Sequence, residues 1–250
     1  MTTTPEILLV ETDGEIQRIT LNRPERLNAL NQPLTAKLLA HFETLRRDTS
    51  VRVVVVRGAG RGFCAGADLK AAGTADALQD GPNGDWMLRD LMKAMRACPQ
   101  PIVALVKGPA AGGGLTIALT SDVIVAGESA IFHSAFIKVG LTGAELGVSW
   151  RLQRAIGLSL AREVLFAGRP INADLALRSG LVSSVVPDSD LDSHGTALAK
   201  AMLEARPDAL RLTKRTLDLA LECSSYDAAM EAEERAQMLM IARRAQSLAR

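Results

Sequence analysis

The sequence predicts an α/β fold with a largely parallel sheet, and three observations lead to that prediction. Residues 51–56 and 101–106 are nearly continuous apolar, largely β-branched runs, as in strands that are buried on both faces. A glycine-rich loop follows each run, and apolar residues at helical spacing occupy the stretch between them. Such alternation of buried strands and helices is typical of a parallel sheet with right-handed connections.

The remaining elements can be justified in chain order. Residues 7–10 and 16–21 are apolar stretches separated by Asp13-Gly14, which predicts an antiparallel hairpin. Pro33 favours the start of a helix, because its fixed φ suits the first helical turn. Further elements are expected as helices over 33–50, 86–95 and 115–119 and as short strands over 123–126 and 130–132. From Glu145 onward the pattern is mainly helical.

The C-terminal part differs in composition from the rest. Residues 225–250 are amphipathic and rich in Ala, Met, Glu and Arg, which indicates a helix with a face available for assembly. We therefore expect an α/β core over residues 1–195 and a helical C-terminal subdomain over 196–250, with the boundary between 193 and 207.

Composition and charge disfavour several classes of function. The 250 residues have a formal net charge of +1 and no long block of Lys or Arg, so a nucleic-acid-binding role is not expected. A run of 18 apolar residues and a secretory leader are both missing from the sequence, which predicts a cytoplasmic protein that does not enter membranes. Three cysteines and three histidines lack metal-ligand spacing, so neither disulfides nor a metal site are expected.

Two glycine-rich loops are the candidate functional elements. The loop at 60–65 matches a loose G-x-G-x-x-A, but the following residues do not continue as the long helix that a dinucleotide fold requires. Both loops consist of residues too small to hide the backbone amides, and 112–114 precedes a helix. Two such N–H donors could stabilise a thioester enolate by roughly 3–4 kcal/mol each. Turns that need a positive φ would explain the glycines equally well.

Three segments resemble motifs of the crotonase superfamily, the enoyl-CoA hydratases and isomerases. They are residues 22–30, 63–69 and 108–114, and they occur in the family's order and spacing. The resemblance continues to the C-terminus and implies a ββα spiral core with a helical trimerisation region. It also implies an acyl-CoA substrate, with CoA carried by the substrate rather than bound as a cofactor, and a homotrimer or dimer of trimers.

The same resemblance assigns site residues. It places the two oxyanion donors at the backbone amides of Ala67 and Gly113. It places contacts with CoA, largely through the backbone, at Arg26, Ala65, Asp68 and Leu69. Without the resemblance, Arg26 would be interpreted as a solvated surface residue and Asp68 as a cap of the following turn.

The acid and base that hydratases of this family use are replaced in this chain. The resemblance puts their two glutamates at the positions of Thr116 and Phe136, neither of which can act as an acid or base. Glu145 stands where isomerases of the superfamily carry an acidic residue. It could move a proton between two carbons, or it could cap the helix that begins there. His133 is interpreted as a hydrogen-bonded core residue.

The leading hypothesis is therefore an enoyl-CoA isomerase with Glu145 as acid and base. The alternatives are a divergent enoyl-CoA hydratase and a hydrolase of a CoA-linked ring. Two alternatives from other classes are an RNA-binding protein and a catalytically silent CoA-binding homologue. RNA binding is disfavoured because the helix after Pro33 carries only Lys37, Arg46 and Arg47 as fixed cations, beside acidic residues.

Overall fold

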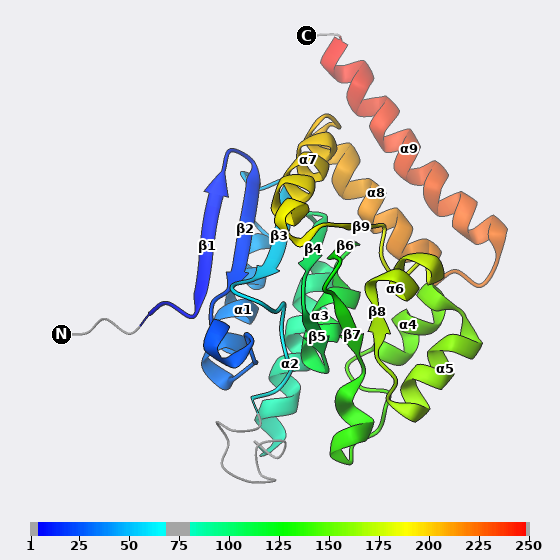
Figure 1. Cartoon of the computed structure of the whole chain (residues 1–250). Helices are drawn as coiled ribbons and strands as arrows, with labels where there is room; N and C mark the ends of the chain where they lie inside the picture. Colours follow the sequence, from blue (N-terminus) through cyan, green and yellow to red (C-terminus); the bar gives the residue numbers. More distant parts are fainter. Residues whose placement is uncertain (1–4, 69–80, 249–250) are drawn as a thin grey trace.

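A six-stranded sheet crosses the part of the chain that the computed structural model describes, residues 5–68 and 81–248 (Figure 1). Its strand order is β1-β2-β3-β4-β6-β9. Only the β1–β2 hairpin is antiparallel in this sheet, and each later neighbour is parallel. The strands are β1 (Leu8–Asp13), β2 (Ile16–Leu21), β3 (Val53–Gly58), β4 (Ile102–Val106), β6 (Val123–Gly127) and β9 (Ser184–Val186). The α/β class and the N-terminal hairpin are confirmed.

A smaller sheet holds the second glycine loop. It consists of β5 (Pro109–Ala111), β7 (Ile131–His133) and β8 (Ile171–Asn172), in that order. Strands β5 and β7 are parallel, whereas β7 and β8 are antiparallel. The amide of Gly112 donates to the carbonyl of His133 at 2.9 Å, so the loop leaves the sheet in a fixed direction. The sequence pattern predicted β7 but missed β5, β8 and β9, which have three residues or fewer.

Three helices cover one face of the large sheet: α1 (Gln32–Leu45), α2 (Gly81–Ala97) and α3 (Gly113–Thr120). Helix α1 begins after Asn31, whose side chain accepts the Leu34 amide at 3.1 Å and so satisfies an otherwise unpaired donor. It ends at Leu45, five residues before the expected end. Phe42, Phe63 and Met95 are at most 1% exposed, and they fill the core between these helices and the sheet.

The second half of the chain is mainly helical. Its helices are α4 (Val148–Ile156), α5 (Leu158–Ala167), α6 (Ala173–Ser179), α7 (Leu191–Leu203), α8 (Pro207–Ala220) and α9 (Tyr226–Leu248). Helix α7 packs on the opposite face of the large sheet, where Leu191 and Ala199 are buried against Val53 and Val55. This helix runs through residue 195, and the expected division of the chain there stays a prediction. Among the described helices, none combines the length and apolar character needed to cross a membrane.

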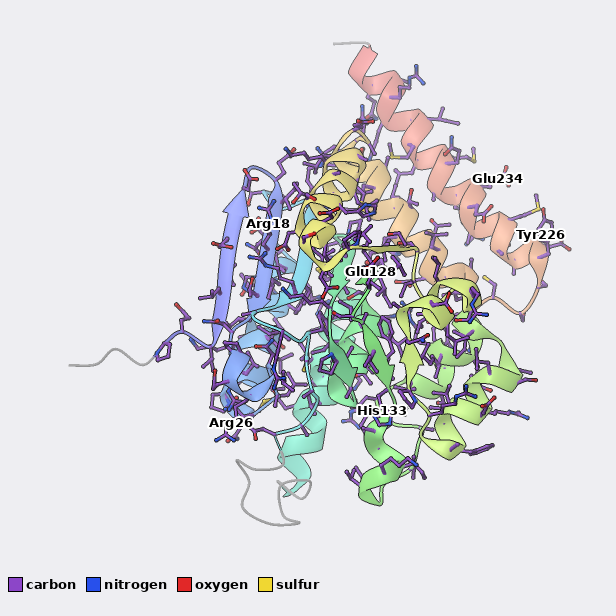
Figure 2. The ribbon with its side chains drawn as sticks, viewed as in Figure 1. Arg18, Arg26, Glu128, His133, Tyr226 and Glu234 are labelled. Carbon is purple, nitrogen blue, oxygen red and sulfur yellow. The ribbon has the colours of Figure 1, made fainter. Side chains whose placement is uncertain are left out.

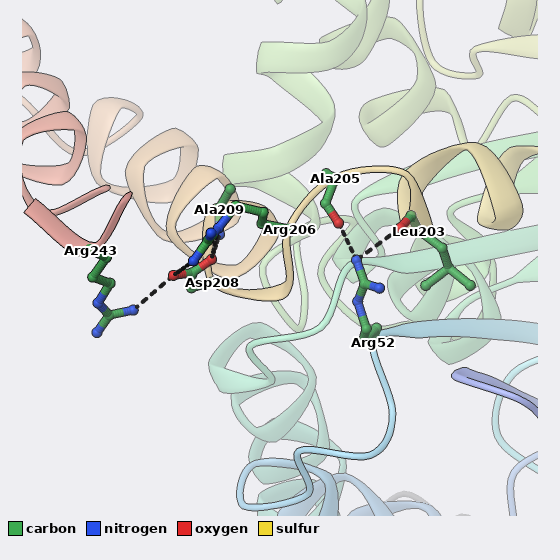
Figure 3. A network of polar contacts seen from close by, with 7 residues as sticks. All are labelled: Arg52, Leu203, Ala205, Arg206, Asp208, Ala209 and Arg243. Atoms are coloured by element: carbon green, nitrogen blue, oxygen red, sulfur yellow. Dashed lines mark hydrogen bonds and ion pairs between the residues drawn. The ribbon is translucent and has the colours of Figure 1, made fainter. Parts of the chain in front are cut away.

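Helices α8 and α9 pack against each other, with α9 outermost (Figure 1). The buried residue of α8 is a charged one, Lys214, which pairs with Asp122 at 2.8 Å and donates to the Gln100 carbonyl at 2.9 Å. Figure 3 shows two further polar contacts: Asp208 of α8 pairs with Arg243 of α9 at 3.4 Å, and Arg52 donates to carbonyls at the end of α7. The buried Lys214–Asp122 pair therefore ties α8 to the start of β6, while the Asp208–Arg243 pair joins α8 to α9.

Candidate active site

A tight turn before α1 organises the first glycine loop. Asn28 is fully buried and has a left-handed φ of 56°, a conformation that asparagine tolerates better than most residues. Its Oδ1 accepts the amide of Arg23 at 2.9 Å, and its Nδ2 donates to the carbonyls of Ala59 and Gly62 at 2.9 and 2.8 Å. One buried amide side chain thus fixes the turn at 22–30 to the loop that follows β3.

The segment 64–67 lies between two partners that are distant in sequence. On one side, the Cys64 amide donates to Pro109 at 3.0 Å, and the Cys64 carbonyl accepts the Ala111 amide at 2.9 Å. On the other side, the Gly66 carbonyl accepts the Leu30 amide at 2.7 Å. The two glycine loops therefore form one hydrogen-bonded unit.

At Gly66 the two loops approach each other closely. Its φ is +88°, and a Cβ built on it would lie 2.7 Å from the Ala111 carbonyl oxygen and 3.3 Å from the Gly113 nitrogen. Any side chain would force the loops apart, so glycine is required here for both conformation and space. The same measurement places the Gly113 amide next to the segment that ends at Ala67.

The amides of Ala67 and Gly113 have no hydrogen-bond acceptor among residues 5–68 and 81–248. Gly113 is buried and is the first residue of α3, where helical geometry leaves the amide without an intrahelical partner. Ala67 is exposed. Two unused donors on adjacent, mutually bonded loops are suited to an oxygen that gains negative charge, because little reorganisation is needed.

Thr116 and Phe136, where the motif resemblance led us to expect a catalytic acid and base, lie beside these loops. Thr116 is 1% exposed, and its hydroxyl donates to the Gly113 carbonyl at 2.7 Å. Phe136 is 9% exposed, and its ring is 3.8 Å from the site of a Cβ on Gly112. Both side chains therefore lie against the second glycine loop, and neither can act as an acid or base.

Glu145 lies in the loop that leads into α4. Its side chain is exposed and accepts the amide of Leu146 at 3.2 Å, while its carbonyl accepts the Val148 amide at 3.0 Å. The hydroxyl of Ser134 donates to the Gly143 carbonyl at 3.0 Å, which ties this loop to the segment of Phe136. Among the described residues, no hydrogen bond joins Glu145 to Ala67 or Gly113. Glu145 instead lines a cavity of about 690 Å³ between α2, α4 and α8.

Comparison with known proteins identifies the family. Residues 11–248 match the family model described as enoyl-CoA hydratase/isomerase. The chain belongs to this family. A probable enoyl-CoA hydratase of Mycobacterium tuberculosis is 43% identical over 244 residues, which are 95% of this chain and 86% of the relative. The 1,2-epoxyphenylacetyl-CoA isomerase of Escherichia coli is 33% identical over 94% of this chain and 90% of its own.

Solved structures agree with this assignment. A probable enoyl-CoA hydratase/isomerase from Mycobacterium abscessus has a TM-score of 0.86 at 36% identity, and the match covers 94% of this chain and 90% of that one. A monofunctional enoyl-CoA isomerase from M. smegmatis has a TM-score of 0.77 at 39% identity, with 90% and 98% covered. The crotonase-like fold expected from the motifs is confirmed, and both hydratases and isomerases occur among the relatives.

The residues expected to contact CoA in this crotonase-type enzyme lie around the first loop. Arg26 is exposed in the turn before α1, near the edge of the molecule (Figure 2). The amide of Ala65 donates to the Leu27 carbonyl at 2.9 Å. Asp68 forms an ion pair with Arg23 at 2.7 Å, and Leu69 lies outside the described residues. These contacts with CoA stay a prediction.

Sequence reasoning missed two residues that shape this site, Arg23 and Asn28. The guanidinium of Arg23 pairs with Asp68 and donates to the Ala29 carbonyl at 2.5 Å, so it links the turn to the residue after Ala67. The side chains of Arg23 and Asp68 are only 12% and 6% exposed. Both residues lie within the motif at residues 22–30, where a polar Arg and a polar Asn in a turn were the signal in the sequence.

Other candidate groups have structural partners. The ring of His133 makes a hydrogen bond with the Gly168 carbonyl at 3.0 Å, in keeping with its interpretation as a core residue (Figure 2). Burial raises the pKa of the Cys64 thiol to about 12, so it is not available as a thiolate nucleophile. In the described part of the chain, no group of three His, Cys, Asp or Glu side chains could hold a metal ion.

Proposed function

We propose that this protein isomerises the double bond of an enoyl-CoA thioester, with Glu145 as acid and base. The observation that supports this proposal best is the combination of two unused amides, at Ala67 and Gly113, with non-ionisable side chains at both hydratase positions. The amides suit a thioester enolate, and the family match indicates an acyl-CoA substrate. Glu145 is the carboxylate in the neighbouring loop.

The reaction would proceed in two proton transfers. Glu145 removes a proton from the carbon next to the thioester of a 3-enoyl group, and the electron pair moves onto the thioester oxygen as a dienolate. The amides of Ala67 and Gly113 stabilise that oxygen. The protonated Glu145 then returns the proton to the fourth carbon, which leaves the double bond in conjugation with the thioester. Atoms and charge balance without any external reactant.

An enoyl-CoA hydratase is the second candidate, because the relative from M. tuberculosis is named a probable enoyl-CoA hydratase. Hydration needs one group to activate water and another to protonate carbon. Thr116 and Phe136 supply neither. The M. smegmatis relative, described as a monofunctional enoyl-CoA isomerase, supports the first candidate.

Replacement of Glu145 by glutamine tests the proposal. Removal of a general acid–base group should lower kcat for 3-enoyl-CoA isomerisation by about 10²- to 10⁴-fold, with KM changed much less. Glu128→Gln is the matched control, since Glu128 is an exposed carboxylate in another part of the molecule (Figure 2). Equal rates in wild type and Glu145→Gln would refute the proposed role. Incorporation of oxygen-18 from water into product would instead indicate hydration.

We also propose that the protein is a cytoplasmic homotrimer or a dimer of trimers. Large apolar side chains are exposed on α8 and α9, among them Leu217, Tyr226, Met238 and Ile241 at 63%, 78%, 64% and 59%. Exposed apolar residues at this density favour burial against another subunit. Sedimentation equilibrium would measure the mass, and a monomer at micromolar concentration would contradict this part of the proposal.

A further inference from the structure

The cavity beside Glu145 lies between facing sides of two helices. Met92, Lys93 and Arg96 of α2 line one side of it, and Asp218 of α8 and Glu222, which follows the end of α8, line the other. Met92 and Arg96 are four residues apart, which places them on one face of α2. Glu145 and Leu146 lie at the edge of the cavity, so it continues from the loop that bears the proposed acid–base group.

The cavity is too large to be filled by a short acyl group, and its lining at Thr120 is too far from Gly113 for such a group to reach. Helix α3 runs from Gly113 to Thr120, which lines the cavity, and these residues are about 10 Å apart at the helical rise of ~1.5 Å per residue. An extended chain advances about 1.2 Å per bond, so four carbons span about 4 Å and twelve span about 13 Å. At roughly 30 Å³ for each water-sized group, 690 Å³ accommodates roughly twenty non-hydrogen atoms.

The charges around the cavity nearly cancel. Its lining includes four basic side chains, Arg89, Lys93, Arg96 and Arg151, and three acidic ones, Glu145, Asp218 and Glu222. The guanidinium of Arg151 donates to carbonyls at the end of α3, at 2.7 and 2.9 Å. Lys93 pairs at 3.5 Å with Asp90, a residue that does not line the cavity. With Met92, Leu146 and Trp150 also in the lining, the chemistry suits an apolar chain better than a second anionic group.

An ion pair bridges the two helices across this cavity. Arg96 of α2 pairs with Asp218 of α8 at 2.9 Å and lies 3.9 Å from Glu222, and the side chains of the Arg96–Asp218 pair are about a quarter exposed. The guanidinium also lies 5.5 Å from the ring centre of Trp150. Arg96 is thus held by contacts with α8 and with α4.

We propose that this cavity is the distal acyl subsite, that it selects long unbranched apolar acyl groups, and that the Arg96–Asp218 pair closes its outer end. The proposal rests on the proposed acyl-CoA function, which supplies the thioester end of the substrate. It assigns α8 a role in substrate selection in addition to assembly. The preferred substrate is then an enoyl-CoA of about twelve carbons rather than four.

Binding of unreactive saturated thioesters tests the subsite independently of the reaction. Calorimetry would measure the affinities of butanoyl-CoA and of dodecanoyl-CoA, the latter below its critical micelle concentration. Dodecanoyl-CoA should bind at least about tenfold more tightly. Ala97→Trp, at an exposed lining position, should bring the two affinities within about threefold by filling the cavity. Lys93→Trp fills it from the preceding turn and should do the same. Circular dichroism would verify that both variants fold.

A second measurement tests closure by Arg96. Arg96→Met removes both ion pairs but keeps an apolar stem, so it should improve hexadecanoyl-CoA binding relative to dodecanoyl-CoA by about threefold or more. Glu163→Gln breaks an exposed pair between Glu163 of α5 and Arg169, and it should leave this ratio unchanged.

The proposed subsite would be refuted if wild type bound dodecanoyl-CoA no more tightly than butanoyl-CoA. It would also be refuted if both tryptophan variants kept the preference of wild type for the longer chain. An unchanged ratio in Arg96→Met would overturn closure. Because saturated thioesters cannot isomerise, activity in Glu145→Gln would refute the proposed reaction without affecting these binding results.

Discussion

Replacement of Asp68 by asparagine should destabilise the protein far more than the loss of an exposed ion pair does. Asp68 and Arg23 are 2.7 Å apart, with side chains 6% and 12% exposed. At an effective dielectric constant of ~20, their gross attraction is about 6 kcal/mol, and much of it offsets the cost of removing both charges from water. The variant leaves the Arg23 charge buried without its carboxylate.

Loss of one partner from a buried pair costs about 3–5 kcal/mol of unfolding free energy. We expect the lower end of this range, about 3 kcal/mol, because Arg23 keeps its hydrogen bond to the Ala29 carbonyl. For a chain of this size, that corresponds to a fall in Tm of about 6–12 °C. Urea denaturation and calorimetry would measure both quantities.

Asp174→Asn is the matched control. Asp174 and Arg178 are also 2.7 Å apart, but their side chains are 71% and 68% exposed, so the expected cost is at most about 1 kcal/mol. The two pairs share this distance and differ strongly in burial. Equal costs, within about 0.5 kcal/mol, would refute the reasoning that burial makes the Arg23–Asp68 pair important.

Two further predictions concern titratable groups. Burial raises the pKa of the Cys64 and Cys98 thiols, so iodoacetamide at pH 8 should label Cys223 at least about tenfold faster in the native protein, as measured by peptide mass spectrometry. Faster labelling of Cys64 would contradict this expectation. Burial also lowers the pKa of His41, although nearby Asp48 opposes the shift. The neutral ring is then favoured by folding, so its contribution is complete above pH ~6.5 and is lost as pH falls through the folded pKa. As pH falls from 7 to 5, the unfolding free energy of His41→Gln should therefore decrease less than that of wild type. Parallel plots of unfolding free energy against pH would contradict this prediction.

The regular part of the fold was predictable because burial leaves a strong periodic pattern. The strands around Val55 and Ala104, and the helix around Leu38, follow from such patterns. Strands β5 and β8 have three and two residues, too few for a period to be recognised, and β5 lies inside a glycine loop. Their existence depends on pairing with β7, which is a tertiary effect.

The site was predictable only in part, for a similar reason. Small residues in the two loops indicated amides that side chains do not cover; the amides of Ala67 and Gly113 have no acceptor among residues 5–68 and 81–248, and their role stays a prediction. The pairing of Arg23 with Asp68 could not be inferred from local pattern, since the two residues meet only when the turn and the loop fold together. The cavity beside Glu145 likewise depends on how α8 packs against α2.

The bridging of residues 64–67 between Leu30 and Ala110 has a consequence for folding kinetics. Neither the turn nor the glycine loops can orient the Ala67 amide alone, because its position depends on contacts between segments far apart in the chain. Such contacts form late, after the entropy of closing long loops has been overcome. On refolding, enzymatic competence should therefore return after most helical signal has recovered, which makes turnover a sensitive reporter of complete tertiary structure.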